Sequence, residues 1–380
     1  MDVLVLGGGY AGVTLARRLS DRLPDDAALT LVDDTGRHLV KHEVHRVIRD
    51  PSLAEVIEID LAELVPDATL REARVEAVDP DARTVNLADG ETLSYDACAV
   101  CLGATPAFHG IEGAAEHGNP LSTVDDALAI REAALPAIED EGRVVVAGAG
   151  LSGVQVAGEL AAMADARDAD AEVLLLERLS RVAPAFDDAF SDAVRETLTA
   201  AGVAVRTDAT VAAVDGDDVE LADGESVAHD ALVWTGGIAG PAALDGERPQ
   251  VRSTMELGAS TFVMGDAARV VDADGEAVPA SAQAAIREAP VVAANLLALV
   301  GDDDSGGFRP RLDQFAFDSP GWVVSVGDDA VAQVGPSVVR GRAALALKAT
   351  VGAGYLSSVG AVRDAVGLVN EELGLADAVE

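Results

Sequence analysis

The chain has 380 residues, of which 49% are apolar, and a formal net charge of −39 that is spread through every segment. This length allows two or three domains, and the acidity argues against nucleic acid as a partner. No apolar run reaches the roughly 18 residues of a membrane-spanning helix, and Met1 leads directly into an apolar run, so we expect a cytoplasmic protein that is soluble or peripheral.

The first twelve residues predict a turn that binds a dinucleotide. The apolar run 1–6 breaks into a Gly-x-Gly-x-x-Gly pattern, and an amphipathic stretch, 13–23, follows. Such a turn joins a buried strand to a helix whose N-terminus faces a pyrophosphate. The next strand, 29–32, ends in an acid that would bind ribose hydroxyls; without it, the glycines would indicate only a turn. The expected site residues are Gly7, Gly9, Tyr10, Ala11, Gly12, Asp33 and Asp34.

Two groups of reactive side chains do not predict a metal or redox centre. His38, His42 and His45 would share one face of a helix, but no acidic or cysteine cluster accompanies them, so we predict no metal site. Cys98 and Cys101 lie in a strand-like run, where their spacing places them on opposite faces. Redox pairs with this spacing sit at helix N-termini, so we expect buried structural thiols.

The opening unit occurs a second time. After a polar connection with an expected helix at 124–138, the apolar run 143–147 enters a second glycine pattern, and a later strand, 173–176, ends in an acid. The short strands expected between residues 75 and 95 also return between 211 and 229, and Leu-Ala-Asp-Gly-Glu is found in both copies. This is an internal repeat of one dinucleotide-binding unit. The second set of expected site residues is Gly148, Gly150, Ser152, Gly153 and Glu177.

Two dinucleotide units in one chain indicate electron transfer between two bound nucleotides, and a duplicated fold with one inactive site is the alternative. Asp33 and Glu177 suit a free ribose 2′-hydroxyl and would repel a 2′-phosphate, which favours NAD over NADP. Arg178, directly after Glu177, weakens this preference.

With these two units the sequence resembles the two-dinucleotide-binding flavoproteins, and among them most closely the type II NADH dehydrogenases, which are single-subunit NADH:quinone oxidoreductases. The resemblance covers about residues 1–300 and implies that FAD occupies the first fingerprint and NADH the second. It implies an α/β fold with two Rossmann-like domains, the second inserted in the first, and a small C-terminal α+β domain. The expected limits are 1–107 and 240–300 for the FAD domain, 108–239 for the NADH domain and 308–380 for the C-terminal domain.

The resemblance also assigns roles to single residues. Gly265 and Asp266 match a strand-to-Gly-Asp motif whose aspartate holds the ribityl chain of the flavin. Ala282 and Gln283 begin a stretch that lies on the quinone side in the family. Arg287 replaces the family's final glutamine in this stretch, which leaves the identity of the acceptor open. The expected crossings between the two units contain Gly103, Ala104, Thr105 and Gly236.

Three side chains are candidates for catalysis under this resemblance: Glu159, Lys41 and Gln283. Glu159 would lie near the junction of nicotinamide and flavin and pass a proton to reduced quinone; a solvated helix residue is the alternative. Lys41 would lie beside the isoalloxazine ring and stabilise negative charge on it, unless it is a solvated surface lysine. Cysteines are absent from 38–49 and after Cys101, which excludes the sulfur chemistry of related disulfide and sulfide:quinone reductases.

The C-terminal segment differs in charge from the rest of the chain. After a polar linker, 301–310, and an expected small antiparallel sheet, 315–334, residues 334–363 contain no acid. Their basic residues are Arg340, Arg342, Lys348 and Arg363. This composition predicts contact with an anionic membrane surface, and C-terminal amphipathic helices of type II NADH dehydrogenases have that role. A helix pair buried against the core or in a homodimer interface is the alternative.

Lysine is scarce, since only two of the 27 basic residues are lysines. Such acidity with little lysine is typical of proteins from a salt-saturated cytoplasm, and an acidic surface in an ordinary cell is the alternative. The functional prediction is a halophilic, peripheral FAD enzyme, on the cytoplasmic face of the membrane, that oxidises NADH and reduces a quinone or another small acceptor. The alternatives are a soluble NAD(P)H-dependent flavin reductase that serves ferredoxin and a non-enzymatic redox-sensing flavoprotein.

Overall fold

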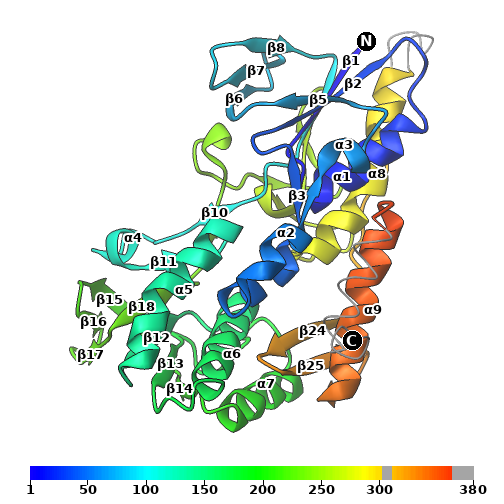
Figure 1. The fold of residues 1–380 in the computed structure, drawn as a ribbon. Helices are drawn as coiled ribbons and strands as arrows, with labels where there is room; N and C mark the ends of the chain where they lie inside the picture. The colour runs from blue at the N-terminus through cyan, green and yellow to red at the C-terminus, as the bar shows by residue number, and fades with distance from the viewer. Residues whose placement is uncertain (302–309, 362–380) are drawn as a thin grey trace. The chain divides into compact units, whose positions relative to one another are not determined.

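The computed structural model describes residues 1–301 and 310–361, which form two compact units (Figure 1). The first unit comprises Met1–Leu39, Glu58–Thr105 and Ile238–Ser319. The second comprises Val40–Ile57, Pro106–Gly237 and the described residues from Pro320 onward. The predicted α/β fold, with one dinucleotide unit inserted in the other, is confirmed. Most of the expected linker, and Arg363, lie outside the described residues.

The domain limits expected from the sequence remain a prediction, and the compact units are grouped differently at two places. Residues 40–57 contact the second unit, although they precede its fingerprint by about a hundred residues in the sequence. The segment from Pro320 is grouped with the second unit as well. Both segments therefore belong to the second compact unit.

The first unit is built on a six-stranded sheet with the order β21-β22-β9-β1-β2-β5. Every neighbouring pair is parallel except the pair formed by the edge strand β21. Residues 3–6 of β1 are all buried, as a continuous apolar run in a central parallel strand predicts. The strands are β1 (Asp2–Leu6), β2 (Ala28–Asp33), β5 (Thr69–Glu72), β9 (Ala97–Val100), β21 (Glu256–Gly258) and β22 (Thr261–Val263).

Two helices of the first unit, α1 (Tyr10–Ser20) and α8 (Ala282–Val300), pack against each other and against strands of this sheet. Among the described residues α8 alone is long and apolar enough to cross a membrane, but half of that window is buried in the protein, as in a core helix. The remaining elements are β3 (Arg37–Leu39), β4 (Glu58–Asp60), α3 (Leu61–Leu64), β6 (Val75–Asp79), β7 (Thr84–Leu87), β8 (Thr92–Ser94), β19 (Ile238–Ala239), η3 (Ala242–Leu244), β20 (Gln250–Val251), η4 (Gly265–Ala267) and β23 (Arg269–Val270). The short strand β10 (Thr105–Pro106) ends the second segment of this unit.

The second unit contains a five-stranded parallel sheet with the order β11-β18-β12-β13-β14. The part β18-β12-β13-β14 repeats the arrangement β9-β1-β2-β5, so the internal repeat read from the sequence is also structural. The strands are β11 (Asn119–Pro120), β12 (Arg143–Ala147), β13 (Glu172–Leu176), β14 (Ala204–Arg206), β15 (Val211–Val214), β16 (Asp218–Leu221), β17 (Ser226–Ala228) and β18 (Ala231–Trp234). The helices are η1 (Lys41–Ile48), η2 (Pro51–Leu53), α2 (Ala54–Ile57), α4 (Ala114–His117), α5 (Val124–Glu139), α6 (Leu151–Asp165) and α7 (Asp188–Ala200).

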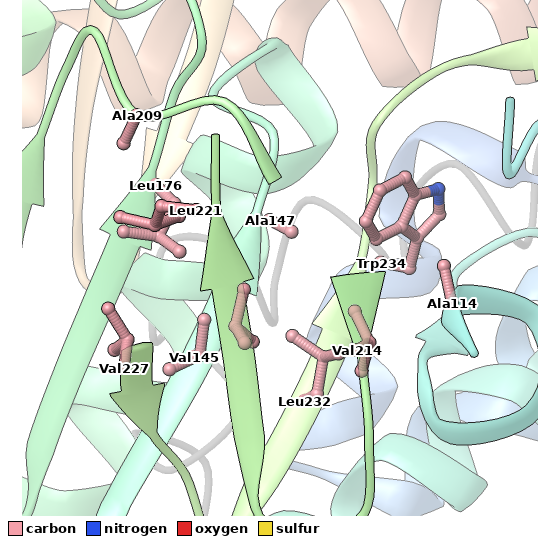
Figure 2. Close-up of a cluster of buried hydrophobic side chains, with 11 residues drawn as sticks. Ala114, Val145, Ala147, Leu176, Ala209, Val214, Leu221, Val227, Leu232 and Trp234 are labelled. Carbon is pink, nitrogen blue, oxygen red and sulfur yellow. The ribbon is translucent and has the colours of Figure 1, made fainter. Parts of the chain in front are cut away.

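The meander β15-β16-β17 shares an apolar core with the parallel sheet of the second unit (Figure 2). Val145 and Leu232 of the sheet cluster with Val214 and Val227 of the meander, and each is at most 5% exposed. Trp234, at the end of β18, completes this cluster and donates its indole N–H to the Ala107 carbonyl at 2.8 Å. Burial at this point fixes the end of β18, from which the chain continues to Gly236.

The C-terminal part of the second unit is a three-stranded antiparallel sheet followed by one helix. Its elements are β24 (Gly321–Val326), β25 (Asp329–Val334), β26 (Ser337–Arg340) and α9 (Arg342–Ser358). The sequence predicts this sheet correctly but starts it six residues early and omits β26. β24 packs on α6 where Gly158 offers no side chain, since a Cβ there would clash with backbone atoms of Gly327 and Val326.

Candidate functional site

The first fingerprint forms the turn between β1 and α1, and its glycines serve different purposes. Gly7 has a φ of +102°, and a Cβ at this position would clash with the Cys101 carbonyl. A Cβ on Gly12 would clash with the Gly7 carbonyl, whereas Gly9 faces open space. The helix begins after Gly9 with no side-chain cap and no acid in its first turn. Its free N–H groups therefore suit a phosphate group.

Asp33 is brought to this turn by the pairing of β2 with β1. One of its carboxylate oxygens accepts the N–H of Gly8 at 2.7 Å, and the other accepts those of Thr35 and Gly36 at 2.9 and 3.1 Å. The Thr35 hydroxyl also donates to the latter oxygen, at 2.8 Å, whereas the oxygen bound by Gly8 accepts one hydrogen bond and keeps a lone pair for a ribose hydroxyl. Asp34 is exposed next to it. The geometry fits the predicted role of Asp33 in binding a dinucleotide.

The second fingerprint repeats this arrangement between β12 and α6. Gly148 has a φ of +104°, and a Cβ there would lie 2.7 Å from the Thr235 carbonyl oxygen. Gly150 faces open space, and α6 begins after it with no side-chain cap and no acid in its first turn. A Cβ on Gly153 would clash with the Gly148 carbonyl, and Ser152 is exposed beside it. Each unit therefore has its own cradle for a phosphate.

Glu177 has the same place in the second unit as Asp33 in the first. Its carboxylate accepts the N–H of Ala149 at 2.8 Å with one oxygen and that of Leu179 at 2.8 Å with the other. Ala149 is the middle residue of the second glycine turn, as Gly8 is of the first. Both strand-end acids thus bind their own fingerprint through backbone N–H groups, which fixes their position for a ribose.

The Gly-Asp motif lies beside the first fingerprint within the first unit. A Cβ on Gly265, which has a φ of +65°, would lie 3.3 Å from the Cβ of Ala11 in the first turn of α1. Asp266 is half-buried, and Arg248 fixes its backbone by donating from Nε to its carbonyl at 2.7 Å. The fold therefore brings together two segments that the sequence separates by more than 250 residues. This proximity fits the expectation that both segments contact one FAD.

The expected crossing residues lie in both units. In the first unit Gly103 has a φ of +70°, Ala104 is half-buried, and Thr105 donates its hydroxyl to the Gly240 carbonyl at 3.1 Å. In the second unit Gly236 is exposed two residues after the end of β18. Their contacts with FAD or NADH stay predictions.

The predicted quinone-side residues begin α8. Ser281 caps this helix by accepting the N–H of Ala284 at 3.2 Å, and Ala282 is the first helical residue. The side-chain oxygen of Gln283 accepts a hydrogen bond from the Ser319 hydroxyl at 3.1 Å. Arg287 is exposed one turn further along the helix. Binding of a quinone by these residues stays a prediction.

Glu159 is not a solvated helix residue, because its side chain is only 1% exposed. Its carboxylate pairs with the Nε of Arg49 at 2.8 Å and lies 4.0 Å from the Nε2 of His45. Burial raises the pKa of Glu159, and the positive charges of Arg49 and Lys348 offset part of this rise. Because its pKa is raised, this carboxyl group binds a proton more readily than an exposed carboxyl group does.

A buried polar cluster surrounds Glu159 inside the second unit. The Nε2 atom of His45 lies 2.8 Å from the Ser325 hydroxyl, and Gln155 reaches the same hydroxyl at 3.4 Å. Burial lowers the pKa of His45 well below its ordinary value, so the ring is neutral. Arg49 also pairs with the carboxylate of Asp328 at 2.6 Å. These side chains come from η1 and its C-cap, from α6, and from β24 and the turn after it, which are three segments distant in the sequence.

The histidine segment differs from the sequence expectation. His38 lies in β3 of the first unit, whereas His42 and His45 lie in the 3-10 helix η1 of the second, so the expected single helical face is wrong. His38 is fixed within its own unit, with Nδ1 2.8 Å from the Gly8 carbonyl and its ring edge-on to Tyr10. No group of His, Cys, Asp or Glu in the described residues is arranged to hold a metal ion. Lys41 is half-buried at the start of η1.

The acid-free C-terminal segment turns part of its positive charge inward. Lys348 is only 5% exposed and pairs with the carboxylate of Glu43 at 3.0 Å. Arg340 pairs with Glu196 at 2.5 Å on the surface. The outer face of α9 instead presents Arg342 and apolar side chains such as Val351, which is 63% exposed. Lys348 therefore cannot take part in the expected membrane contact of this segment, and its burial fits the alternative of packing against the core.

No site role was predicted from the sequence for three buried residues, Glu43, His45 and Glu288, or for the half-buried Arg49. His45 was considered only as a metal ligand, and Arg49 and Glu43 were not singled out. One signal was available for Glu288, since it is the only acid in the mostly apolar helix α8. The partners of Glu43 and Arg49 are remote in sequence, so no local pattern reveals them.

Comparison with known proteins gives a consistent family. The sequence profile of the family described as "Pyridine nucleotide-disulphide oxidoreductase" matches residues 1–289. The NADH dehydrogenase-like protein YutJ of Bacillus subtilis is 29% identical over 237 residues, which span 62% of this chain and 65% of that protein, just under two thirds of its length. A type II NADH:quinone oxidoreductase of Staphylococcus epidermidis is 25% identical over 404 aligned positions, with coverage of 95% and 96%.

Among solved structures, NDH2 from Plasmodium falciparum in complex with NADH superposes with a TM-score of 0.81. The match covers 98% of this chain and 97% of that chain at 14% sequence identity. At this identity the similarity establishes the fold over nearly the whole chain, including the C-terminal part.

Proposed function

This chain belongs to the pyridine nucleotide-disulphide oxidoreductase family, and we propose that it is an FAD-dependent enzyme that oxidises NADH and passes the electrons to a quinone. The observation that carries this proposal is the pair of equivalent cradles, each with an uncapped helix N-terminus and an acid bound to its glycine turn. The similarity to a type II NADH:quinone oxidoreductase over nearly the full length of both chains supports the quinone as acceptor.

In the proposed reaction the protein has to align NADH with FAD and does not have to supply a nucleophile. FAD, when bound, accepts a hydride from NADH and gives two electrons to the acceptor. The N-termini of α1 and α6 hold the two pyrophosphates, and Asp33 and Glu177 hold the ribose hydroxyls. Cys98 and Cys101 are free and buried, and burial raises the pKa of both thiols, so they stay protonated and unreactive.

Three side chains have separate proposed roles in catalysis. Glu159 holds a proton in the buried cluster of the second unit and releases it toward the reduced acceptor. Lys41 stabilises negative charge near the flavin, and Gln283 contacts the acceptor. Arg287 stands where the family has a glutamine, so we propose an acceptor headgroup that tolerates a nearby guanidinium.

The location of the enzyme is proposed from the surface of α9. Arg342 and the exposed side chains of Leu347 and Val351 lie on the part of this helix that faces away from the unit. We propose that this face contacts the cytoplasmic side of an anionic membrane, where the quinone is dissolved. A homodimer contact through the same face is the competing proposal. Sedimentation with anionic vesicles in high salt, compared with Val351→Asp, separates the two.

The acidic surface is proposed to be an adaptation to high salt. A net charge of −39 repels itself at low ionic strength, and screening by concentrated salt removes that repulsion. Activity and stability should therefore be measured in concentrated potassium chloride.

The test is anaerobic mixing of the purified yellow protein with NADH, followed by a soluble quinone. We expect NADH to bleach the flavin absorbance and the quinone to restore it. Bleaching without recovery would exclude the quinone as acceptor and favour a soluble flavin reductase. Bound FAD that NADH does not bleach would contradict the enzyme proposal and favour a redox-sensing protein.

A further inference from the structure

A buried acid, Glu288, lies behind the Gly-Asp motif of the first unit and has no role in the proposed function so far. It occupies the second turn of α8, and its side chain is 1% exposed. One of its carboxylate oxygens accepts the backbone N–H of Gly265 at 2.6 Å. Gly265 adopts the left-handed conformation that aims the chain into Asp266, so Glu288 fixes the residue that presents Asp266 to the flavin.

Few charges surround this carboxyl group. Asp266 on η4 repels its negative form, and the neutral thiol of Cys101 lies beyond the end of β9. Arg287, next to it on α8, is exposed. The titratable groups of α1, which packs along α8, are Tyr10, Arg17 and Arg18, and none of them influences Glu288. The carboxylate is therefore buried with a backbone N–H but without a cation among the described residues.

This environment makes the proton on Glu288 sensitive to added charge. Burial raises the pKa of Glu288 to about 7, Asp266 adds to the rise, and the hydrogen bond from Gly265 opposes it. A group that titrates near neutral pH changes its protonation when a further negative charge appears nearby in a medium of low dielectric constant. Reduction of a flavin held by Asp266 would supply such a charge.

We propose that Glu288 is a positioning residue of the flavin site that also takes up one proton when the bound flavin is reduced. The inference rests on the proposed FAD site in the first unit. Two electrons and one proton reach the flavin as the hydride of NADH, which leaves as NAD+. The Glu288 carboxylate binds one further proton from solvent and becomes a neutral acid that still accepts the Gly265 N–H. That proton returns to solvent when the acceptor reoxidises the flavin.

The test is a redox titration of the FAD-loaded protein with a chemical reductant at several pH values, for the wild type and for Glu288→Gln. Glutamine keeps an oxygen that can accept the Gly265 N–H but removes the charge and the proton site. We expect reduction of the flavin to raise the proton affinity of Glu288 at least tenfold. Between the low-pH and high-pH limits, this should lower the two-electron midpoint potential of the wild type by at least about 30 mV relative to that of Glu288→Gln. Around the pH at which Glu288 titrates, the midpoint potential of the wild type should fall more steeply with pH than that of Glu288→Gln.

The two proteins should agree at low pH, and Glu288→Gln should have the higher potential at high pH because it lacks the buried negative charge. Parallel curves at all pH values would overturn the inference. Glu76→Gln, which removes an exposed acid on β6 of the same unit, is the matched control and should follow the wild type.

A second measurement needs no variant. In wild-type protein at a pH just above that at which Glu288 titrates when the flavin is oxidised, and below that at which it titrates when the flavin is reduced, the reduced-minus-oxidised infrared difference spectrum should gain the carbonyl band of a protonated carboxylic acid. Absence of this band would overturn the inference even if Glu288→Gln failed to fold. Because the reductant is chemical, loss of the reaction with NADH would contradict the proposed function without affecting this result.

Discussion

Lys348 of α9 and Glu43 of η1, which are 305 residues apart in the sequence, form an ion pair inside the second unit with Nζ 3.0 Å from Oε2. Glu43 also lies 3.2 Å from Arg46. Burial opposes the charge on Glu43, but the positive charges of Lys348 and its neighbours outweigh it and hold the pKa of Glu43 well below its ordinary value. The pair ties the C-terminal helix to the segment that carries Arg49 and His45.

The first prediction concerns this ion pair. Lys348→Met should lower the free energy of unfolding by roughly 3 to 5 kcal/mol, because it leaves a buried carboxylate without its main counter-charge. Urea denaturation followed by circular dichroism measures the loss. Arg342→Met, on the exposed side of the same helix, should change the free energy of unfolding by less than about 0.5 kcal/mol. A similar loss for both variants would contradict the assignment.

The pH dependence of the stability loss in Lys348→Met follows from the direction in which the pKa of Glu43 is shifted. The pKa of Glu43 lies below its unfolded value of 4.5, so its contribution is present above that pH and disappears as the pH falls through the lower folded value. The deficit of Lys348→Met should therefore be full at neutral pH and smaller in acid. Glu43→Gln combined with Lys348→Met should recover part of the stability at neutral pH.

The second prediction assigns the two fingerprints. Gly9 and Gly150 face open space, so valine at either position fills the room left for a pyrophosphate without a clash inside the protein. Gly9→Val should lose bound FAD, measured by flavin absorbance after gel filtration. Gly150→Val should keep its FAD but lose reduction by NADH, while a chemical reductant still bleaches it. The opposite pattern would exchange the two sites.

The sequence predicted these two cradles because their requirements are local. Gly7, Gly12 and their counterparts Gly148 and Gly153 have no space for a Cβ, so the pattern in the chain is a direct consequence of the turn. The repeated strand order follows from the repeated unit. Parallel pairing then fixes each strand-end acid beside its own turn, as seen for Asp33.

The buried cluster of the second unit could not be predicted in this way. Glu43 and Lys348 show no local pattern, and their pairing depends on the packing of α9 against the unit. For the acid-free, apolar segment that contains Lys348, the sequence left membrane contact and burial as alternatives, although positive charge usually stays at a surface. The 3-10 helix η1 was taken for an α-helix, and this placed His38 wrongly beside His42.

The third prediction concerns nucleotide preference. Glu177 should repel the 2′-phosphate of NADPH, so the ratio of kcat/KM for NADH to that for NADPH should be high in the wild type. Glu177→Gln removes the charge and should lower this ratio by about 10-fold to 100-fold, or roughly 1.4 to 2.7 kcal/mol. Asp33→Asn is the control, since it should weaken FAD binding and leave the ratio unchanged. An unchanged ratio in Glu177→Gln would show that another residue, such as Arg178, determines the preference for NADH over NADPH.

The fourth prediction concerns salt. The Debye length falls from about 10 Å at 0.1 M to about 3 Å at 1 M salt, so concentrated potassium chloride screens the repulsion among the surface carboxylates. The thermal unfolding midpoint should therefore rise steadily with potassium chloride concentration. Sucrose at matched osmolality is the control, because it acts through exclusion from the surface and not through charge. An equal rise in both solutes would show that screening is not the cause.

The fifth prediction compares two glycines inside helices of the second unit. A Cβ on Gly158 of α6 would clash with the backbone of Gly327 and Val326, so Gly158→Ala must push α6 away from β24. We expect a loss of about 1 to 3 kcal/mol in the free energy of unfolding. Gly354 of α9 faces open space, so Gly354→Ala should instead gain about 0.5 to 1 kcal/mol from reduced backbone entropy of the unfolded chain. Since Glu159 follows Gly158 directly, Gly158→Ala should also disturb the ion pair between Glu159 and Arg49. A shift in the pH profile of NADH oxidation would measure that effect. Gly354→Ala should not show this shift.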